Sequence, residues 1–265
     1  MNLFFRELKS YRNGLFFWSI GMIALVASGM AKFAAYSGPG QSMNDIISQF
    51  PRSFQTIFGL SGFDLSKASG FYGVLFIYIA LMATVHAVLL GTDIISKEER
   101  DRTSEFLFVK PVSRSKIITA KLLAGLFNVV VLNIVTLFSS IYFVNYFSKT
   151  GSASSDIKLM MAGLFFLQIL FFFTGAATAA ASKKPKAASS IATTILLVTF
   201  TISFLTNINV SLDKLKYLTP FRYFDAQTLL TNGKMDPMYI SITLVLIIFM
   251  IIASYQRYTG RDLNV

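Results

Sequence analysis

The sequence predicts an all-α integral membrane protein with six transmembrane helices, and three observations lead to that fold class. Only 14% of the 265 residues are charged, against roughly 25% in soluble domains. The mean hydropathy is +0.60. The charges are gathered in a few clusters that are separated by long uncharged stretches. Too little polar surface exists to cover a soluble globule of this size.

Six uncharged windows are long enough to cross a bilayer, which takes about 20 mostly apolar residues in a helix. These windows are residues 13–31, 68–92, 122–148, 159–182, 187–212 and 237–256. They lack the alternation of apolar and polar residues that is typical of barrel strands. Because a spanning segment must satisfy its own backbone hydrogen bonds, helices are predicted. Residues 1–265 then form a single transmembrane domain. A cleaved signal at the first window is disfavoured, because Lys32 and Phe33 interrupt any small-residue cleavage site.

The basic charge predicts how the chain is oriented. The net charge is +11, but much of it flanks the apolar windows, which favours membrane anchoring over nucleic-acid binding. If the N-terminus is cytosolic, the inner segments are 1–12, 93–121, 183–186 and 257–265, and they hold most of the 24 Lys and Arg residues. The positive-inside bias therefore predicts a multi-pass protein of the plasma membrane with both termini in the cytosol.

The first twelve residues have the spacing of an amphipathic helix. Leu3, Phe4, Leu8 and Tyr11 share one helical face, and basic residues lie elsewhere around it. Such a helix lies in the membrane interface beside lipid headgroups, and we predict one over residues 1–12. A frayed basic tail is the alternative.

Two outer segments are also expected to be structured. Residues 42–51 carry apolar residues at helical spacing and predict a short amphipathic helix on the outer surface; a docking site for a partner is the alternative. Residues 217–224 place four aromatic rings around Pro220 and Arg222. Aromatic rings favour the headgroup layer, so this segment is predicted to be partly re-entrant before the last span. The residues Pro220, Phe221 and Arg222 are predicted to form an outer gate.

The cytosolic segment 93–121 carries more information than an anchor requires. Basic residues alone would serve the positive-inside bias, yet Glu98, Glu99 and Glu105 stand among them. An apolar block follows, Pro111 interrupts it, and Ser113 can cap a new helix that leads into the third span. The segment is either a structured element that faces a partner or a solvated charged loop.

Four short strings in this segment resemble the first cytosolic loop of ABC-2 type transporter permeases. They are Glu98-Glu99-Arg100, Thr103-Ser104-Glu105-Phe106-Leu107, Lys110-Pro111-Val112-Ser113-Arg114 and Lys121-Leu122-Leu123-Ala124-Gly125. The resemblance extends over nearly the whole chain and is greatest to bacterial drug and peptide exporters of the bacitracin and β-exotoxin type. One departure is Thr103-Ser104, where the family often has Gly-Thr.

The resemblance implies a coupling helix that docks on a separate cytosolic ABC ATPase. ATP and Mg would bind that partner, a second permease chain would complete the pathway as a homodimer or heterodimer, and a drug, peptide or lipid-like substrate would cross by alternating access. The resemblance assigns docking contacts to Glu98, Glu99, Arg100, Arg102, Thr103, Glu105, Phe106, Pro111 and Arg114.

The sequence offers no catalytic machinery of its own. It has no phosphate-binding Gly-x-x-x-x-Gly-Lys-Ser/Thr string, no cysteine and one histidine. We therefore predict that the chain is not an enzyme and holds no metal or cofactor. The alternatives to an exporter permease are a stand-alone secondary transporter and a membrane scaffold or immunity protein. An intramembrane metalloprotease is disfavoured, because its metal site would need more ligands than one histidine.

Polar residues within the spans are the remaining candidates. His86, Asn128, Asn133 and Gln168 are predicted to face other helices rather than lipid. Each either lines a pathway or forms a hydrogen bond with a neighbouring helix, and for His86 the hydrogen bond is the simpler interpretation. The small residues 175–181 predict close helix packing.

Overall fold

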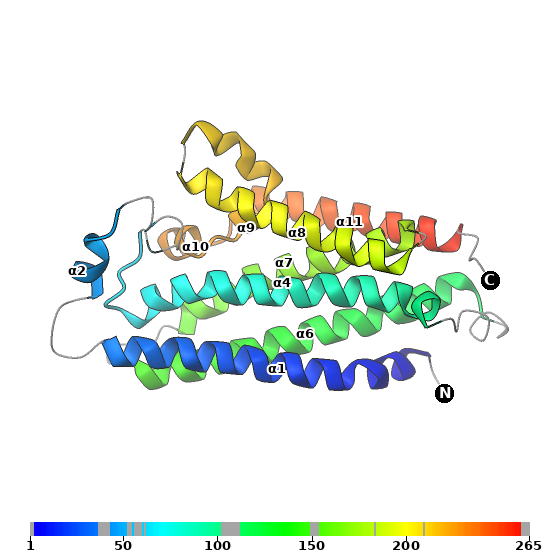
Figure 1. Cartoon of the computed structure of the whole chain (residues 1–265), viewed down its shortest axis with the longest axis horizontal. Coiled ribbons are helices and arrows are strands. Elements are labelled where there is room, and N and C mark those ends of the chain that lie inside the picture. The colour runs from blue at the N-terminus through cyan, green and yellow to red at the C-terminus, as the bar shows by residue number, and fades with distance from the viewer. Residues whose placement is uncertain are drawn as a thin grey trace.

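The computed structural model describes residues 3–36, 43–51, 55, 60, 62–101, 112–148, 154–182, 184–208 and 210–260. Within these ranges six helices are long and apolar enough to cross a membrane. They are α1 (Leu3–Tyr36), α4 (Ala68–Arg100), α6 (Arg114–Phe147), α7 (Ser154–Ala181), α8 (Pro185–Ile208) and α11 (Pro237–Thr259). The predicted all-α membrane fold is confirmed. The helices lie side by side along one axis (Figure 1).

Short helices gather at one end of this bundle. They are α2 (Met43–Ser48), the 3₁₀ helix η1 (Val210–Leu218), α9 (Pro220–Tyr223) and α10 (Ala226–Asn232). The first residues of α1 and the last residues of α11 lie together at the other end (Figure 1). An even number of crossings requires this arrangement. We call the end that carries the chain termini the terminal end, and the other the distal end.

The helices begin and end where local chemistry dictates. The Ser113 hydroxyl accepts a hydrogen bond from the Lys116 amide and caps α6 as predicted. Asp236 caps α11 ahead of a proline in its first turn. Asp225 caps α10, which ends at Gly233 in the left-handed conformation that favours glycine.

Helices α4 and α7 form the centre of the bundle. Their apolar windows are 67% and 72% buried inside the protein, against 17% for both α8 and α11. A Cβ atom added to Gly91 would collide with the carbonyl oxygen of Phe172, and one on Gly175 would collide with that of Val88. The predicted close packing of the small-residue run is therefore confirmed. In a membrane such contact is a main source of helix association.

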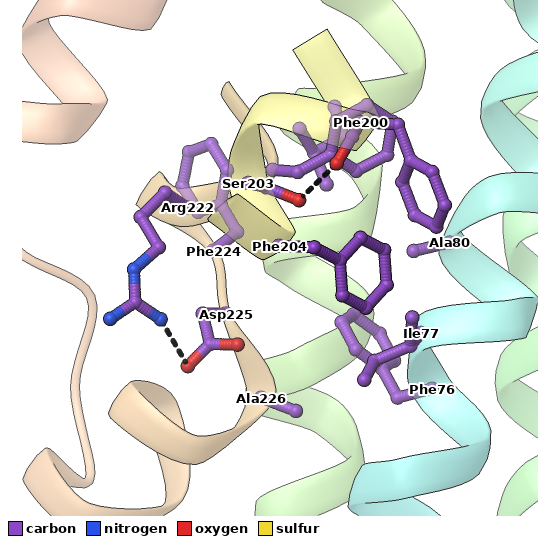
Figure 2. Close-up of a pocket in the computed structure, with 12 residues that line it drawn as sticks. Phe76, Ile77, Ala80, Phe200, Ser203, Phe204, Arg222, Phe224, Asp225 and Ala226 are labelled. Carbon is purple, nitrogen blue, oxygen red and sulfur yellow. Dashed lines mark hydrogen bonds and ion pairs between the residues drawn. The ribbon is translucent and has the colours of Figure 1, made fainter. Parts of the chain in front are cut away.

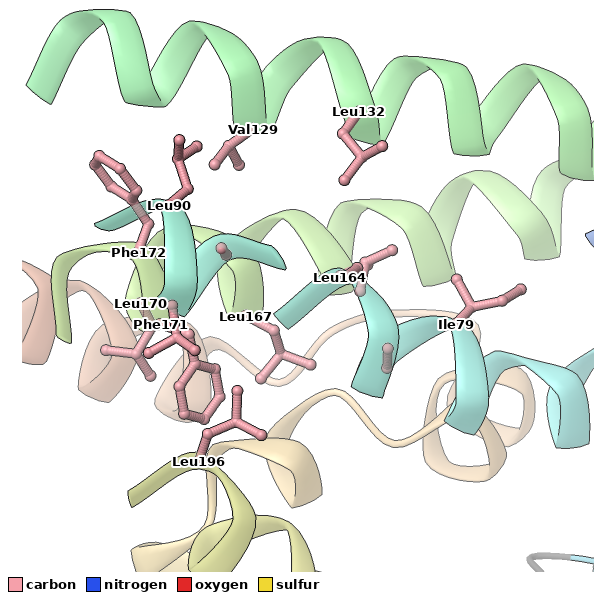
Figure 3. Packing of buried hydrophobic residues seen from close by; sticks show 14 of the residues in the cluster. Ile79, Leu90, Val129, Leu132, Leu164, Leu167, Leu170, Phe171, Phe172 and Leu196 are labelled. Atoms are coloured by element: carbon pink, nitrogen blue, oxygen red, sulfur yellow. The ribbon is translucent and has the colours of Figure 1, made fainter. Parts of the chain in front are cut away.

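Large aliphatic and aromatic side chains fill the space around this central pair. Figure 3 shows side chains of α4, α6, α7 and α8 meeting between the helices. Leu132, Leu164 and Phe172 are completely buried. Each such side chain contributes many small dispersion contacts, which hold the outer helices against α4 and α7.

Several helix boundaries in the structure differ from the predicted ones. Residues 3–12 and the first span form one uninterrupted helix, so no separate N-terminal helix is present in the described residues. The predicted stripe of Leu3, Phe4, Leu8 and Tyr11 packs against the core. The fifth span was predicted to reach residue 212, but α8 ends at Ile208 and the 3₁₀ helix begins at Val210.

The segment 93–121 is also more helical than a loop. Helix α4 continues to Arg100 and α6 begins at Arg114, so charged residues extend both helices beyond the uncharged windows. A helix satisfies its own backbone groups on either side of the membrane boundary. The coupling helix itself would lie between them, and residues 102–111 are outside the described residues.

At the distal end the predicted helix within 42–51 is present as α2. Asn44 ties it to the segment before α4, because its amide donates to the Asp64 carboxylate at 2.9 Å and accepts from the Leu65 backbone. Ser66 donates to the same carboxylate at 2.5 Å. The hydrogen bonds from Ser66 and Asn44 hold the pKa of Asp64 well below its usual range.

Candidate functional site

Residues 219–224, in the segment before the last span, are built into the protein, whereas Tyr217 and Leu218 ahead of them are exposed. Thr219 is fully buried, and its hydroxyl donates to the Thr199 carbonyl of α8 at 2.7 Å. Pro220 starts the short helix α9 and is buried. Irregular backbone at membrane depth must be covered by protein or water, and here the neighbouring helices cover it.

Aromatic rings join this segment to three long helices. The Phe221 ring lies 5.2 Å from that of Phe171 on α7 and 5.1 Å from that of Phe200 on α8. Phe224 stacks on Phe166 of α7 with ring centroids 5.5 Å apart. Tyr223 stacks in the same way on a tyrosine of α11. Such ring pairs add stabilisation beyond that of apolar burial. A change in the relative positions of α7, α8 and α11 would therefore move this segment.

Phe200, Phe221 and Phe224 border a small cavity near the distal end, which we call the outer pocket (Figure 2). It encloses about 40 Å³ between α4, α7, α8 and the α9–α10 segment, and only Arg222 and Asp225 carry charge on its wall. The Arg222 guanidinium lies 3.5 Å from the Asp225 carboxylate. The outer pocket is lined by Phe76, Ile77, Ala80, Leu167, Phe200, Ser203, Phe204, Phe221, Arg222, Phe224, Asp225 and Ala226.

Two of the three predicted gate residues, Phe221 and Arg222, therefore line the outer pocket, and Pro220 positions them at the start of α9. An aromatic cavity with one ion pair on its wall can hold an apolar group and orient a polar one. Whether it opens as a gate stays a prediction.

A network of charged and polar side chains occupies the terminal end of the bundle. Lys121 of α6 is fully buried, and its ammonium group donates to the Glu98 carboxylate and to the Ile94 carbonyl of α4, both at 2.6 Å. A buried charge is tolerated only when it is paired and hydrogen-bonded. This contact therefore fixes the end of α4 against the start of α6.

Further contacts extend the network to α1 and α11. The Tyr11 hydroxyl donates to the Asp93 carboxylate at 2.8 Å, and Asp93 also pairs with Arg100. Lys97 donates to the Ser10 hydroxyl. The guanidinium of Arg114 donates to the Thr259 carbonyl of α11 at 3.2 Å. The two helices that flank residues 102–111 are thus tied to both terminal helices of the chain.

The predicted docking residues divide into two groups. Glu98 points inward to Lys121, with 12% of its side chain exposed, and Arg100 is paired with Asp93 and Asp101. Glu99 lies in the last turn of α4, and Arg114 starts α6. The others lie outside the described residues: Arg102, Thr103, Glu105, Phe106 and Pro111. Their docking role stays a prediction.

The polar residues within the spans also separate in space. Asn133 on α6 donates to the Gln168 side chain of α7 at 2.8 Å, deep in the packed interior. His86 and Asn128 instead border a second cavity. The hydrogen bond expected for His86 is not formed with any described residue, and its ring packs edge-on against Trp18 at 5.2 Å.

A protein-family comparison decides what this bundle is. Residues 7–258 match the family model described as "Multidrug efflux system permease Rv1217c, C-terminal domain". The chain belongs to this multidrug efflux permease family. No match was found among curated proteins. The six apolar helices and the family together make the chain a multi-pass membrane permease.

Sequence reasoning missed part of what holds this permease together. Lys121 was placed at the edge of a loop, although Asn128 follows it at a spacing of seven residues, which returns to the same helical face. On α4, Asp93 follows His86 at the same spacing. The seven-residue spacing on both helices could have indicated that a polar helix face continues from the charged segment into the span.

Proposed function

We propose that the chain is the transmembrane subunit of an ABC-2 type exporter, which moves a drug, peptide or lipid-like molecule across the plasma membrane. A separate cytosolic ATPase binds ATP and Mg and drives alternating access. A second permease chain supplies the other half of the pathway. The terminal end, with both chain termini, faces the cytosol. The efflux permease family supports the transport role. The sequence has no phosphate-binding loop, which agrees with an energy source on a partner chain.

One structural observation carries the coupling step of this proposal. The helices on either side of residues 102–111 are joined by the buried Lys121–Glu98 pair. Because α4 is tied to α1 and α6 is tied to α11 at the same end, a push on the segment between α4 and α6 would move these helices together. Rigid elements with two arrangements are how such coupling is carried. An ATPase gripping residues 102–111 therefore shifts α4 and α6 as one body.

The test is co-purification of the partner ATPase with charge-reversed chains. Glu98 is a poor choice, because its loss leaves Lys121 buried without its carboxylate. The double variant Glu99→Lys/Glu105→Lys keeps that pair and adds positive charge on the proposed cytosolic side. Lys214→Glu/Lys234→Glu is the matched control, since both lysines are exposed near the distal end and the change favours the same orientation.

The proposal predicts that the loop variant loses the ATPase and that the control retains it. Both variants must reach the membrane in similar amounts, measured by immunoblot of washed membranes. Equal recovery of the ATPase with the loop variant and the control would contradict docking at this segment.

A further inference from the structure

A second cavity lies between α1, α4 and α6, three helices that run alongside one another (Figure 1). It measures about 170 Å³, which makes it roomier than the outer pocket, and it shares no lining residue with that pocket. We call it the α1–α4–α6 cavity. Its lining residues are Tyr11, Gly14, Leu15, Trp18, His86, Leu89, Leu90, Asp93 and Asn128.

Two buried polar side chains on its wall have unused hydrogen-bonding capacity. His86 is 4% exposed, and its Nδ1 atom has no hydrogen-bond partner among the described residues. Asn128 is 2% exposed, and the one hydrogen bond it forms with described residues uses its Nδ2 atom, which donates to Ala124 of its own helix. Unpaired polar atoms in a buried site cost free energy unless a ligand or water pairs with them.

The one formal charge on the lining is negative. Asp93 lies about 10 Å along α4 from His86, at 1.5 Å per residue. Its carboxylate already binds Tyr11 and Arg100, one at each oxygen, but a carboxylate has about four acceptor positions. Arg100 is not among the lining residues. The wall therefore offers hydrogen-bond acceptors and a carboxylate, which complement a donor with positive charge.

The rest of the wall is apolar and aromatic. Leu15, Leu89 and Leu90 form it, together with the indole of Trp18. An indole face is the best aromatic partner for an organic cation. The volume is close to that of an apolar cavity of about 150 Å³ that binds benzene in another protein, so one ring or a short branched chain fits.

The cavity opens on the side of the bundle. Gly14 is exposed, Leu89 is 38% exposed, and both lie on helices that present apolar side chains outward. A ligand dissolved in the membrane would reach the cavity past these two residues. An amphipathic amine partitions in that way, with its apolar part in lipid and its charge near the interface.

From this lining we infer that the α1–α4–α6 cavity binds lipophilic amines in their protonated form. The apolar part of the ligand lies against Trp18 and the leucines, and the ammonium group donates to Asp93. A second polar group further along the ligand, or water, pairs with His86 and Asn128. The inference rests on the proposed function, because it names a substrate class for the permease.

The chain provides its own reporter for this site. Trp18 is its only tryptophan, so the intrinsic fluorescence of the full-length chain in lipid nanodiscs reads out the cavity. The probe is phenethylammonium, and 2-phenylethanol is the neutral probe of the same shape. We expect a saturable change with the amine and a dissociation constant at least about tenfold higher for the alcohol, since a charge-assisted hydrogen bond is replaced by a neutral one.

Two variants and one control separate binding from folding. Asp93→Asn keeps the shape and an oxygen for Tyr11, and should weaken amine binding about tenfold. The matched neutralisation Asp156→Asn, at the start of α7, should leave binding unchanged. Gly14→Phe should abolish the response, because Gly14 lines the cavity, a Cβ atom there meets nothing within 4 Å, and a ring attached to it narrows the opening.

Equal affinity for the two probes would overturn the amine assignment and indicate a site for neutral or acyl groups. A response that persists in Gly14→Phe, or no response in the wild-type chain, would overturn the cavity as the site. Neither result depends on the ATPase, whose docking is measured by co-purification, so the two proposals fail separately.

Discussion

The Lys121–Glu98 pair supports a quantitative prediction about stability. Lys121 is completely buried, and Glu98 retains 12% exposure. Glu98→Gln leaves the ammonium group with the Ile94 carbonyl and a neutral amide. Breaking a buried pair from one side costs about 3–5 kcal/mol. Because Glu98 lies near the end of α4, where water can approach, we expect about 3 kcal/mol of lost unfolding free energy, the low end of that range.

Lys121→Met should cost less than Glu98→Gln. Methionine fills a similar volume without a charge, and the carboxylate left behind keeps some access to water. Adding Glu98→Gln to Lys121→Met should then cost little more, since no buried charge remains, so the double variant should be more stable than the sum of the single changes predicts.

The assay is unfolding of the purified chain in mixed micelles with increasing SDS, followed by loss of helical circular dichroism. A matched change at the distal end, Lys234→Met, removes an exposed lysine and should stay within about 0.5 kcal/mol of wild type. Additive effects of the two single variants, or a Glu98→Gln variant as stable as the control, would refute the reasoning.

Three further predictions follow from the packing and the hydrogen bonds. Gly91→Leu should reduce stability by about 3 kcal/mol or more through overpacking, whereas Gly14→Ala should be neutral or stabilising by about 0.5–1 kcal/mol. SDS unfolding compares the two variants, and equal effects would contradict the close contact of α4 and α7. The pKa of Asp64 is depressed by hydrogen bonds, so their contribution to stability is complete above its ordinary value of 3.8. The contribution declines as pH falls from that value toward the lower pKa of the folded state. Limited proteolysis of the distal end should be faster in Asp64→Asn at neutral pH, and wild type should approach that rate in acid; no difference at neutral pH would exclude this role. Asn133→Leu should cost about 1–3 kcal/mol by leaving the Oε1 atom of Gln168 without its donor, and adding Gln168→Leu should restore most of that loss in the same assay. If the second change restores nothing, the pair is not what the first substitution removed.

The number and nature of the spans could be predicted because charge is excluded from lipid. Each window of about 20 uncharged residues became a helix, and Ser113 capped α6 as its side chain predicts. The helix ends could not be predicted in this way. Hydropathy does not predict that α4 continues to Arg100, because the part of a helix outside the membrane needs no apolar residues.

The partners of polar residues were the harder part of the site to predict. Glu98 reads as a surface residue in a mixed-charge segment, and its inward position depends on Lys121, 23 residues further along the chain. His86 was expected to find a hydrogen bond on a neighbouring helix. It does not find one among the described residues, because its ring faces Trp18 and a cavity. Sequence spacing gives the helical face of each residue but not what lies opposite.

The central claim is that a partner ATPase drives transport through this chain. The direct measurement is uptake of ethidium, an organic cation, into inside-out vesicles that hold the chain with its co-purifying ATPase. We predict accumulation that requires ATP, that disappears in Glu99→Lys/Glu105→Lys, and that persists in Lys214→Glu/Lys234→Glu. Accumulation driven by a proton gradient in vesicles that lack any ATPase would contradict the account and identify a secondary transporter instead.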